Sequence, residues 1–177
     1  MKNILCLMVI ILTFKLGFAC KCVNENTLKE EFTATEFIFN GVVISKSLIC
    51  VKETMTSNKA DLLEKEIISK KDLRKFLKQE LIYEVKLKIN EVYKGVKTQK
   101  IITIFTAIHS GACGYRAFKI GKEFIVYASS KSYLYYKFNS FGVINLEKEN
   151  TFWTNHCKKT KEFNKEEAQQ LQKLTKK

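Results

Sequence analysis

The stretch that decides the fold is YEVKLKIN, residues 83–90, in which apolar and polar residues alternate over the whole length. Alternation of this kind places every second side chain on the same face, so we expect a strand with one buried face. Upstream, FIFNGVVI at residues 37–44 is rich in β-branched and aromatic residues and predicts a further strand. A glycine in its interior, Gly41, indicates a bulge or a sharp bend, such as occurs at the corner of a small barrel.

After these two predicted strands, further short stretches of the sequence are typical of strands. Strands are predicted at residues 100–107 and 123–128, and a hairpin is predicted at residues 132–138 and 141–145. Asn164 is placed to cap a closing helix. Many short strands, few crossovers and one terminal helix predict a mainly β fold, a five-stranded closed antiparallel barrel similar to an OB-fold.

Residues 54–81 lie between the first two predicted strands. Their apolar residues have a rough helical spacing among many lysines and glutamates, so we expect one or two amphipathic helices inserted into a long loop. This insert either packs passively on the barrel or forms an arm that contacts a partner, and the sequence leaves both interpretations open.

Residues 1–19 have the features of a signal peptide, with a positive start, an apolar run, and small residues at Gly17 and Ala19. Cleavage after Ala19 makes Cys20 the first residue of a single mature domain, residues 20–177. This predicts secretion to the extracellular space or the periplasm. No later stretch approaches the roughly 18 apolar residues of a membrane-spanning helix, so no such span is expected.

Alternatively, the same N-terminus could carry a lipid anchor. Residues 16–20 resemble the lipobox of a lipoprotein only poorly, because Gly17 stands where a leucine is usual. A lipid on the sulfur of Cys20, with an acylated amine, would leave the protein anchored at the cell surface.

The chain is strongly basic, with 31 Lys and Arg residues against 18 Asp and Glu residues. The signal peptide contains two lysines, Lys2 and Lys15, and no acid, so its removal lowers the net charge from +13 to +11. The cations are nearly all lysines spread along the chain. They form either a solubilising surface or a basic face for a polyanionic surface. No arginine-rich tract indicates nucleic acid as a partner.

The mature chain retains five cysteines, since Cys6 leaves with the signal peptide. Export favours disulfides, and an odd number leaves at least one cysteine unpaired. The competing interpretation is a zinc site, although the paired Cys-x-x-Cys spacing of structural zinc sites is absent. Such a site would use Cys20, Cys22, His156 and Cys157.

Six short motifs occur in series along residues 20–177. They are Cys20-Lys21-Cys22, Phe39-Asn40-Gly41-Val42-Val43, Val92-Tyr93-Lys94-Gly95, Cys113-Gly114-Tyr115, Glu123-Phe124-Ile125-Val126-Tyr127 and Cys157. Each alone is weak, but the Cys-x-Cys start, Tyr-Lys-Gly and Cys-Gly-Tyr in series are fairly specific. In this order they resemble the netrin-like domain of the tissue inhibitors of metalloproteinases. The resemblance covers nearly the whole mature chain and implies the netrin-like form of the barrel.

The resemblance also implies two disulfides, Cys20–Cys113 and Cys22–Cys157, with Cys50 left without a partner. In that family, the α-amine and carbonyl of the first cysteine displace the catalytic water from the zinc of a metalloproteinase. Carried over to this chain, that role falls on Cys20, which would bind the zinc of the target enzyme through its backbone.

The remaining inhibitory contacts follow from the same resemblance. Lys21 would enter the specificity pocket of the proteinase, and the contact would be completed by Cys22, Ala112, Cys113 and Gly114. The family usually has a small hydroxyl residue at the position of Lys21. A lysine carries a desolvation cost in an apolar pocket unless an acidic group meets it.

Two classes of function therefore remain open. The first is a secreted metalloproteinase inhibitor, and the alternative is a netrin-like adaptor that binds partners without inhibiting a proteinase. An enzyme is not expected, because Gly-x-Ser-x-Gly, His-Glu-x-x-His and a glycine-rich phosphate loop are all absent from the sequence. We expect a monomer without a cofactor.

Overall fold

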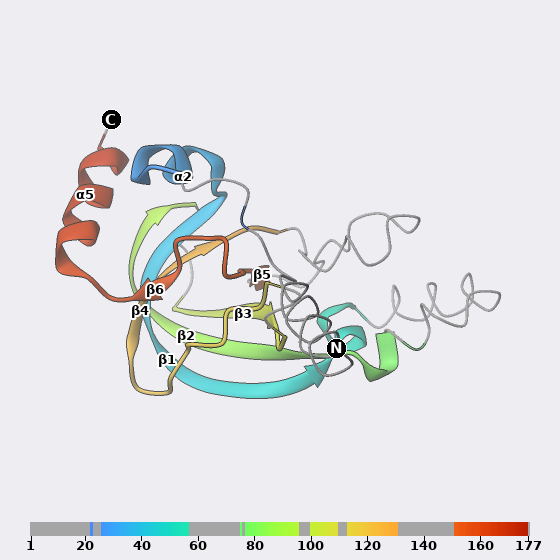
Figure 1. Ribbon diagram of the computed structural model, residues 1–177. Helices are drawn as coiled ribbons and strands as arrows, with labels where there is room; N and C mark the ends of the chain where they lie inside the picture. Colours follow the sequence, from blue (N-terminus) through green and yellow to red (C-terminus); the bar gives the residue numbers. More distant parts are fainter. Residues whose placement is uncertain are drawn as a thin grey trace, which may run out of the picture.

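The computed structural model describes residues 22, 26–56, 75, 77–95, 100–109, 113–130 and 151–176. Within them the fold is mainly β, with one six-stranded sheet in the order β5-β3-β2-β1-β4-β6. The sheet curls into a half-barrel, and α2 and α5 lie together near one end of it (Figure 1). The elements are α2 (Leu28–Ala34), β1 (Phe37–Cys50), the 3-10 helix η1 (Val51–Thr54), β2 (Leu81–Lys94), β3 (Ile101–Ala107), β4 (Glu123–Ala128), β5 (Thr151–Trp153), β6 (Lys161–Glu162) and α5 (Lys165–Thr175).

The long hairpin partners β1 and β2 form the centre of the sheet. Their antiparallel register shifts three times, between Ile38 and Phe39, between Asn40 and Gly41, and between Val43 and Ser45. The irregularity predicted at Gly41 is therefore confirmed. A Cβ at Gly41 would lie 2.7 Å from the carbonyl oxygen of Lys88, so the two backbones approach more closely there than a side chain allows.

The predicted closed barrel of five strands is wrong. The described sheet has two open edges, β5 and β6, which contain three and two residues. The approach of β5 to the end of β4 is a single antiparallel bridge between Ser129 and Trp153. Within the described residues the sheet is therefore a curled half-barrel and not a closed one. The hairpin predicted at residues 132–138 and 141–145 lies outside the described residues.

Alternate residues of the described strands pack into a cluster on each face of the sheet. The inner face of the curled sheet carries the larger one, to which Phe39, Val85 and Leu87 belong. The opposite face carries a smaller one, in which Ile38, Tyr93, Ile125 and Tyr127 meet Ala168 and Leu171 of α5. Leu28 and Phe32 of α2 pack against this second cluster. Both α2 and α5 are therefore held on the sheet by apolar contacts.

The insert predicted at residues 54–81 is described only at its two ends. Thr54 belongs to η1 and Leu81 to β2, so both predicted boundaries lie inside other elements. Helical backbone is present at residues 75 and 77–79, and residues 57–74 lie outside the described residues. At the two ends, Val51, Met55 and Leu77 are buried.

The helices α2 and α5 both begin at side-chain caps. The α5 cap predicted at Asn164 is confirmed, since its side-chain oxygen accepts a hydrogen bond from the backbone N–H of Glu167. The short helix α2 begins at a capping box in which Thr27 and Glu30 bind each other's backbone N–H groups. None of the helices in the described part of the chain is both long and apolar enough to cross a membrane.

Candidate functional site

The candidate site lies at the ends of β3 and β5, two strands that pair in parallel. Parallel strands end at the same edge of a sheet, so the segments that follow Ala107 and Trp153 emerge side by side. Backbone hydrogen bonds join these segments, from the N–H of Thr154 to Phe105 O (3.0 Å) and from the N–H of His156 to Cys113 O (2.7 Å). The sheet thereby places Cys113 next to the residues around Cys157.

Three cysteines meet at this edge, and we call Cys22, Cys113 and Cys157 the cysteine cluster. A disulfide joins Cys22 to Cys157, with their Cα atoms 5.2 Å apart, and this is one of the two pairs that the resemblance implies. The sulfur atoms of Cys157 and Cys113 lie 3.9 Å apart. Cys113 is itself disulfide-bonded, and its partner lies outside the described residues. Of the other predicted site residues, Gly114 follows the cluster, while Cys20, Lys21 and Ala112 lie outside the described residues.

The backbone beside Cys113 is packed too tightly to accept a different residue at position 114. Cys113 adopts a positive φ of 55°, in the left-handed region. A Cβ at Gly114 would lie 1.8 Å from the carbonyl oxygen of Ala107, so only glycine fits there. The N–H of Gly114 donates to His109 O (3.1 Å). These contacts hold Gly114, and with it Cys113, against the end of β3.

Tyr115 anchors the same segment in the inner core. Its N–H donates to the hydroxyl of Thr106 (2.7 Å), and its ring meets that of Phe118 with centroids 4.9 Å apart. Burial, with a smaller contribution from the charge of Glu162, raises the pKa of Tyr115 to about 12. The phenol is therefore neutral at physiological pH and acts as a packing group.

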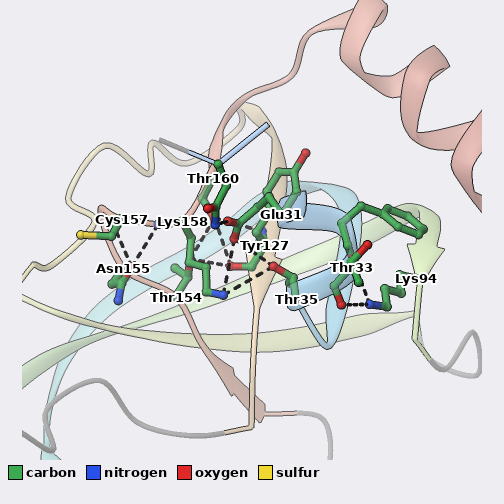
Figure 2. Close-up of polar contacts among 12 residues, drawn as sticks. Glu31, Thr33, Thr35, Lys94, Tyr127, Thr154, Asn155, Cys157, Lys158 and Thr160 are labelled. Atoms are coloured by element: carbon green, nitrogen blue, oxygen red, sulfur yellow. Dashed lines mark hydrogen bonds and ion pairs between the residues drawn. The ribbon is translucent and has the colours of Figure 1, made fainter. Parts of the chain in front are cut away.

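The loop that carries Cys157 is held by side-chain hydrogen bonds. The side-chain oxygen of Asn155 accepts from the N–H groups of Cys157 (3.0 Å) and Lys158 (3.1 Å). On either side, the hydroxyls of Thr154 and Thr160 share a hydrogen bond of 2.8 Å. Thr154 also donates to the backbone carbonyl of Tyr127 in β4 (2.7 Å) (Figure 2). Cys157 is thus attached to the sheet on both sides.

A buried carboxylate, Glu31 of α2, connects this loop to Asn26, and Figure 2 shows Glu31 with Thr35 and Lys158. Its side chain accepts hydrogen bonds from Asn26 (2.9 Å) and from the hydroxyl of Thr35 (2.9 Å), and its Oε1 lies 3.4 Å from Nζ of Lys158. Burial alone would raise the pKa of Glu31. The hydrogen bond from Asn26, the charge of Lys158 and the hydroxyl of Thr35 outweigh burial, so the pKa lies below its ordinary value.

The structure argues against the zinc interpretation of these residues. Cys22 and Cys157 are joined in a disulfide and cannot serve as thiolate ligands. His156 is exposed, and no group of three or more His, Cys, Asp or Glu residues within the described part of the chain is placed to hold a metal ion. Cys50 is a free thiol, as predicted, at the end of β1 and half-buried.

Three residues of this region, Asn26, Glu31 and Lys158, were not singled out from the sequence. The pattern Thr27-x-x-Glu30 is a capping box and could have located α2. No local signal connects Glu31 with Lys158, because the two residues are far apart along the chain and meet only through the fold.

No family model and no curated protein matches this chain.

Proposed function

We propose that this protein is a secreted inhibitor of zinc metalloproteinases that acts through the backbone of a mature N-terminal residue, Cys20. The observation that carries the proposal is the Cys22–Cys157 disulfide beside Cys113, on an edge of the sheet held by Gly114 and Asn155. A disulfide two residues from the reactive amine restricts the motion of that amine. Binding then costs less conformational entropy than it would for a free chain end.

The proposed chemistry uses two backbone atoms of one residue. A catalytic zinc has three protein ligands and one position that is open to water. The α-amine nitrogen and the carbonyl oxygen of Cys20 would displace that water and form a five-membered chelate ring. An α-amine has an ordinary pKa of roughly 8, and zinc binding displaces its proton. No side chain of the inhibitor takes part in this step.

The neighbouring residues would determine which proteinases are bound. Lys21 would enter the specificity pocket, so the preferred target has an acidic or polar group there, because an unpaired buried ammonium is costly. Ala112, Cys113 and Gly114 would flank the contact. The positive net charge of the chain would favour encounter with an acidic enzyme surface.

The test compares native protein with a form that has one extra alanine ahead of Cys20, against a panel of purified metalloproteinases. Intact mass and N-terminal sequencing first establish the cleavage site and the absence of a lipid. The proposal expects that the native form inhibits at least one proteinase and that the extended form, with the same disulfides, loses this inhibition. Equal inhibition by both forms would rule out the chelation mechanism. No inhibition by either would favour the adaptor function.

A further inference from the structure

Three exposed apolar side chains lie on or beside the turn at residues 119–122, which we call the β4 turn. Figure 1 shows it as the bend just before the strand labelled β4. Ile120 lies in this turn and is 65% exposed, while Ile44 of β1 and Phe163, directly after β6, are 43% and 38% exposed. Single exposed apolar side chains are ordinary, but several around one point of the surface indicate a contact with something apolar.

Backbone hydrogen bonds hold the β4 turn against the strands that carry the other two apolar residues. Val43, directly before Ile44, accepts from the N–H of Gly121 (2.8 Å). On the other side, the N–H of Phe163 donates to the carbonyl oxygen of Glu123, the first residue of β4 (2.9 Å). The three segments are therefore fixed beside one another in the folded protein, so a partner would not have to order them on binding.

Basic side chains accompany the apolar ones. The β4 turn and the residues before it contribute Arg116, Lys119 and Lys122, all of them exposed. Two acidic residues border the turn. Glu162 lies 3.8 Å from Nζ of Lys119, but both side chains are exposed and such a pair is weak in water. The carboxylate of Glu123 accepts a hydrogen bond from a side-chain amide of β2 (2.7 Å). The local balance is positive and favours an anionic partner.

The shape of the β4 turn distinguishes between anionic partners. All four of its residues are exposed, and a Cβ added at Gly121 would meet no atom of the described residues within 4 Å. The turn therefore protrudes into solvent. A sulfated polysaccharide or a simple acidic polypeptide would satisfy the cations but leave Ile120 in water. A lipid membrane satisfies both, because its acyl boundary accepts apolar side chains while its headgroups pair with lysines.

We propose that the β4 turn docks on a lipid membrane with anionic headgroups. Ile120 enters the boundary between headgroups and acyl chains, and Lys119 and Lys122 pair with the headgroups. This interaction does not depend on proteinase inhibition. The turn lies at the start of β4, whereas the bridge from Ser129 to Trp153, beside the candidate site, lies just past the other end of that strand. Docking through the turn thus leaves the cysteine cluster at the far end of β4 from the membrane.

The test is sedimentation of the purified protein with two kinds of vesicle. One kind is phosphatidylcholine alone, and the other contains phosphatidylserine as about one lipid in three. The native protein should bind the anionic vesicles and not the neutral ones. Ile120→Ser should lower the partition coefficient about tenfold, through lost apolar burial. The double change Lys119→Gln with Lys122→Gln should lower it about tenfold as well, through lost attraction to the headgroups.

Matched controls change the same residue types elsewhere. Leu48→Ser removes an apolar side chain of β1 that is 54% exposed, and Lys173→Gln with Lys176→Gln removes two cations at the end of α5. Both should bind like the native protein. Ile120→Trp should bind at least as tightly, since tryptophan favours the headgroup level of a membrane.

Two results would overturn the proposal. One is failure of the native protein to bind anionic vesicles. The other is equal binding by native protein and Ile120→Ser, because the contact would then be purely electrostatic, as with a sulfated polysaccharide or an acidic protein. Weaker binding by Ile120→Trp than by the native protein would likewise contradict insertion of this side chain.

Discussion

At the scale of single residues, the backbone contact at Gly114 decides whether the cysteine cluster can form. Gly114 lies against the carbonyl oxygen of Ala107, whereas Gly121 has a φ of +80° and no atom within 4 Å of an added Cβ. At Gly114, a side chain would therefore collide with the backbone. At Gly121, a side chain has room, and only the positive φ disfavours it.

This difference predicts unequal effects of the same substitution. Gly114→Ala should lower the free energy of unfolding by about 3 kcal/mol or more, because a collision with backbone cannot be relieved by a rotamer change. Gly121→Ala should cost only about 1 kcal/mol, the strain of a positive φ. Urea denaturation of both variants measures the two effects. Equal losses would show that β3 and the Cys113 segment are not as close as described.

The ionisation of Glu31 predicts a pH dependence with a definite sign. Its pKa in the folded protein lies below the ordinary value of about 4.3. The carboxylate therefore adds stability that is fully present above the ordinary pKa and is lost as the pH falls through the lower, folded value. Groups near it are the ammonium of Lys158, whose positive charge favours the carboxylate, and the phenol of Tyr127, which stays neutral because burial raises its pKa.

The measurement is denaturant unfolding between pH 2.5 and 7, a range chosen to bracket roughly the ordinary carboxyl pKa. Glu30, whose pKa is also lowered, titrates in the same range, so the informative quantity is the difference between native protein and Glu31→Gln. That difference should be largest near neutral pH and shrink on acidification. A difference that stays constant with pH would mean that Glu31 contributes through shape and not through charge.

At the scale of elements, the sequence predicts what depends on local pattern. The bounds predicted for β4, residues 123–128, are those observed, and the alternation at residues 83–90 lies inside the longer β2. The far half of β1, after Ile44, was missed because SKSLIC does not alternate and its burial pattern is mixed. The two shortest strands, β5 and β6, have no pattern of their own. They are defined only by partners that are distant in the sequence.

The insert between β1 and β2 gives a prediction at this scale. Val51, Met55 and Leu77 are buried, so removing the whole of residues 54–81 should destabilise the protein. Replacing only residues 57–74 with a short flexible linker should keep cooperative unfolding, since loop-closure entropy changes slowly with loop length. Thermal unfolding of both deletions, followed by circular dichroism, distinguishes them. Loss of cooperativity in the shorter deletion would place residues 57–74 in the core.

At the scale of the whole molecule, the described fold connects segments that lie far apart in the sequence. Cys22 and Cys157 are 135 residues apart in sequence, and α2 and α5 lie together at one end of the curled sheet (Figure 1). The central antiparallel strands themselves could be predicted from their patterns, but the order in which they pair was not predicted. The closure of the barrel could not be predicted in this way. It depends on contacts such as the bridge between Ser129 and Trp153, which form only in the folded sheet. Likewise, nothing in the local sequence could show that Glu31 and Lys158 meet.

Whether the Cys20 backbone binds the zinc of a target proteinase can be measured at the metal itself. Zinc has no visible spectrum, but cobalt in its place absorbs visible light in a way that depends on its ligands. Adding native inhibitor to the cobalt form of an inhibited proteinase should change this spectrum. Inhibitor acetylated at the Cys20 amine should leave the spectrum unchanged. An unchanged spectrum in a complex that inhibits fully, or the same change with acetylated protein, would contradict the claim.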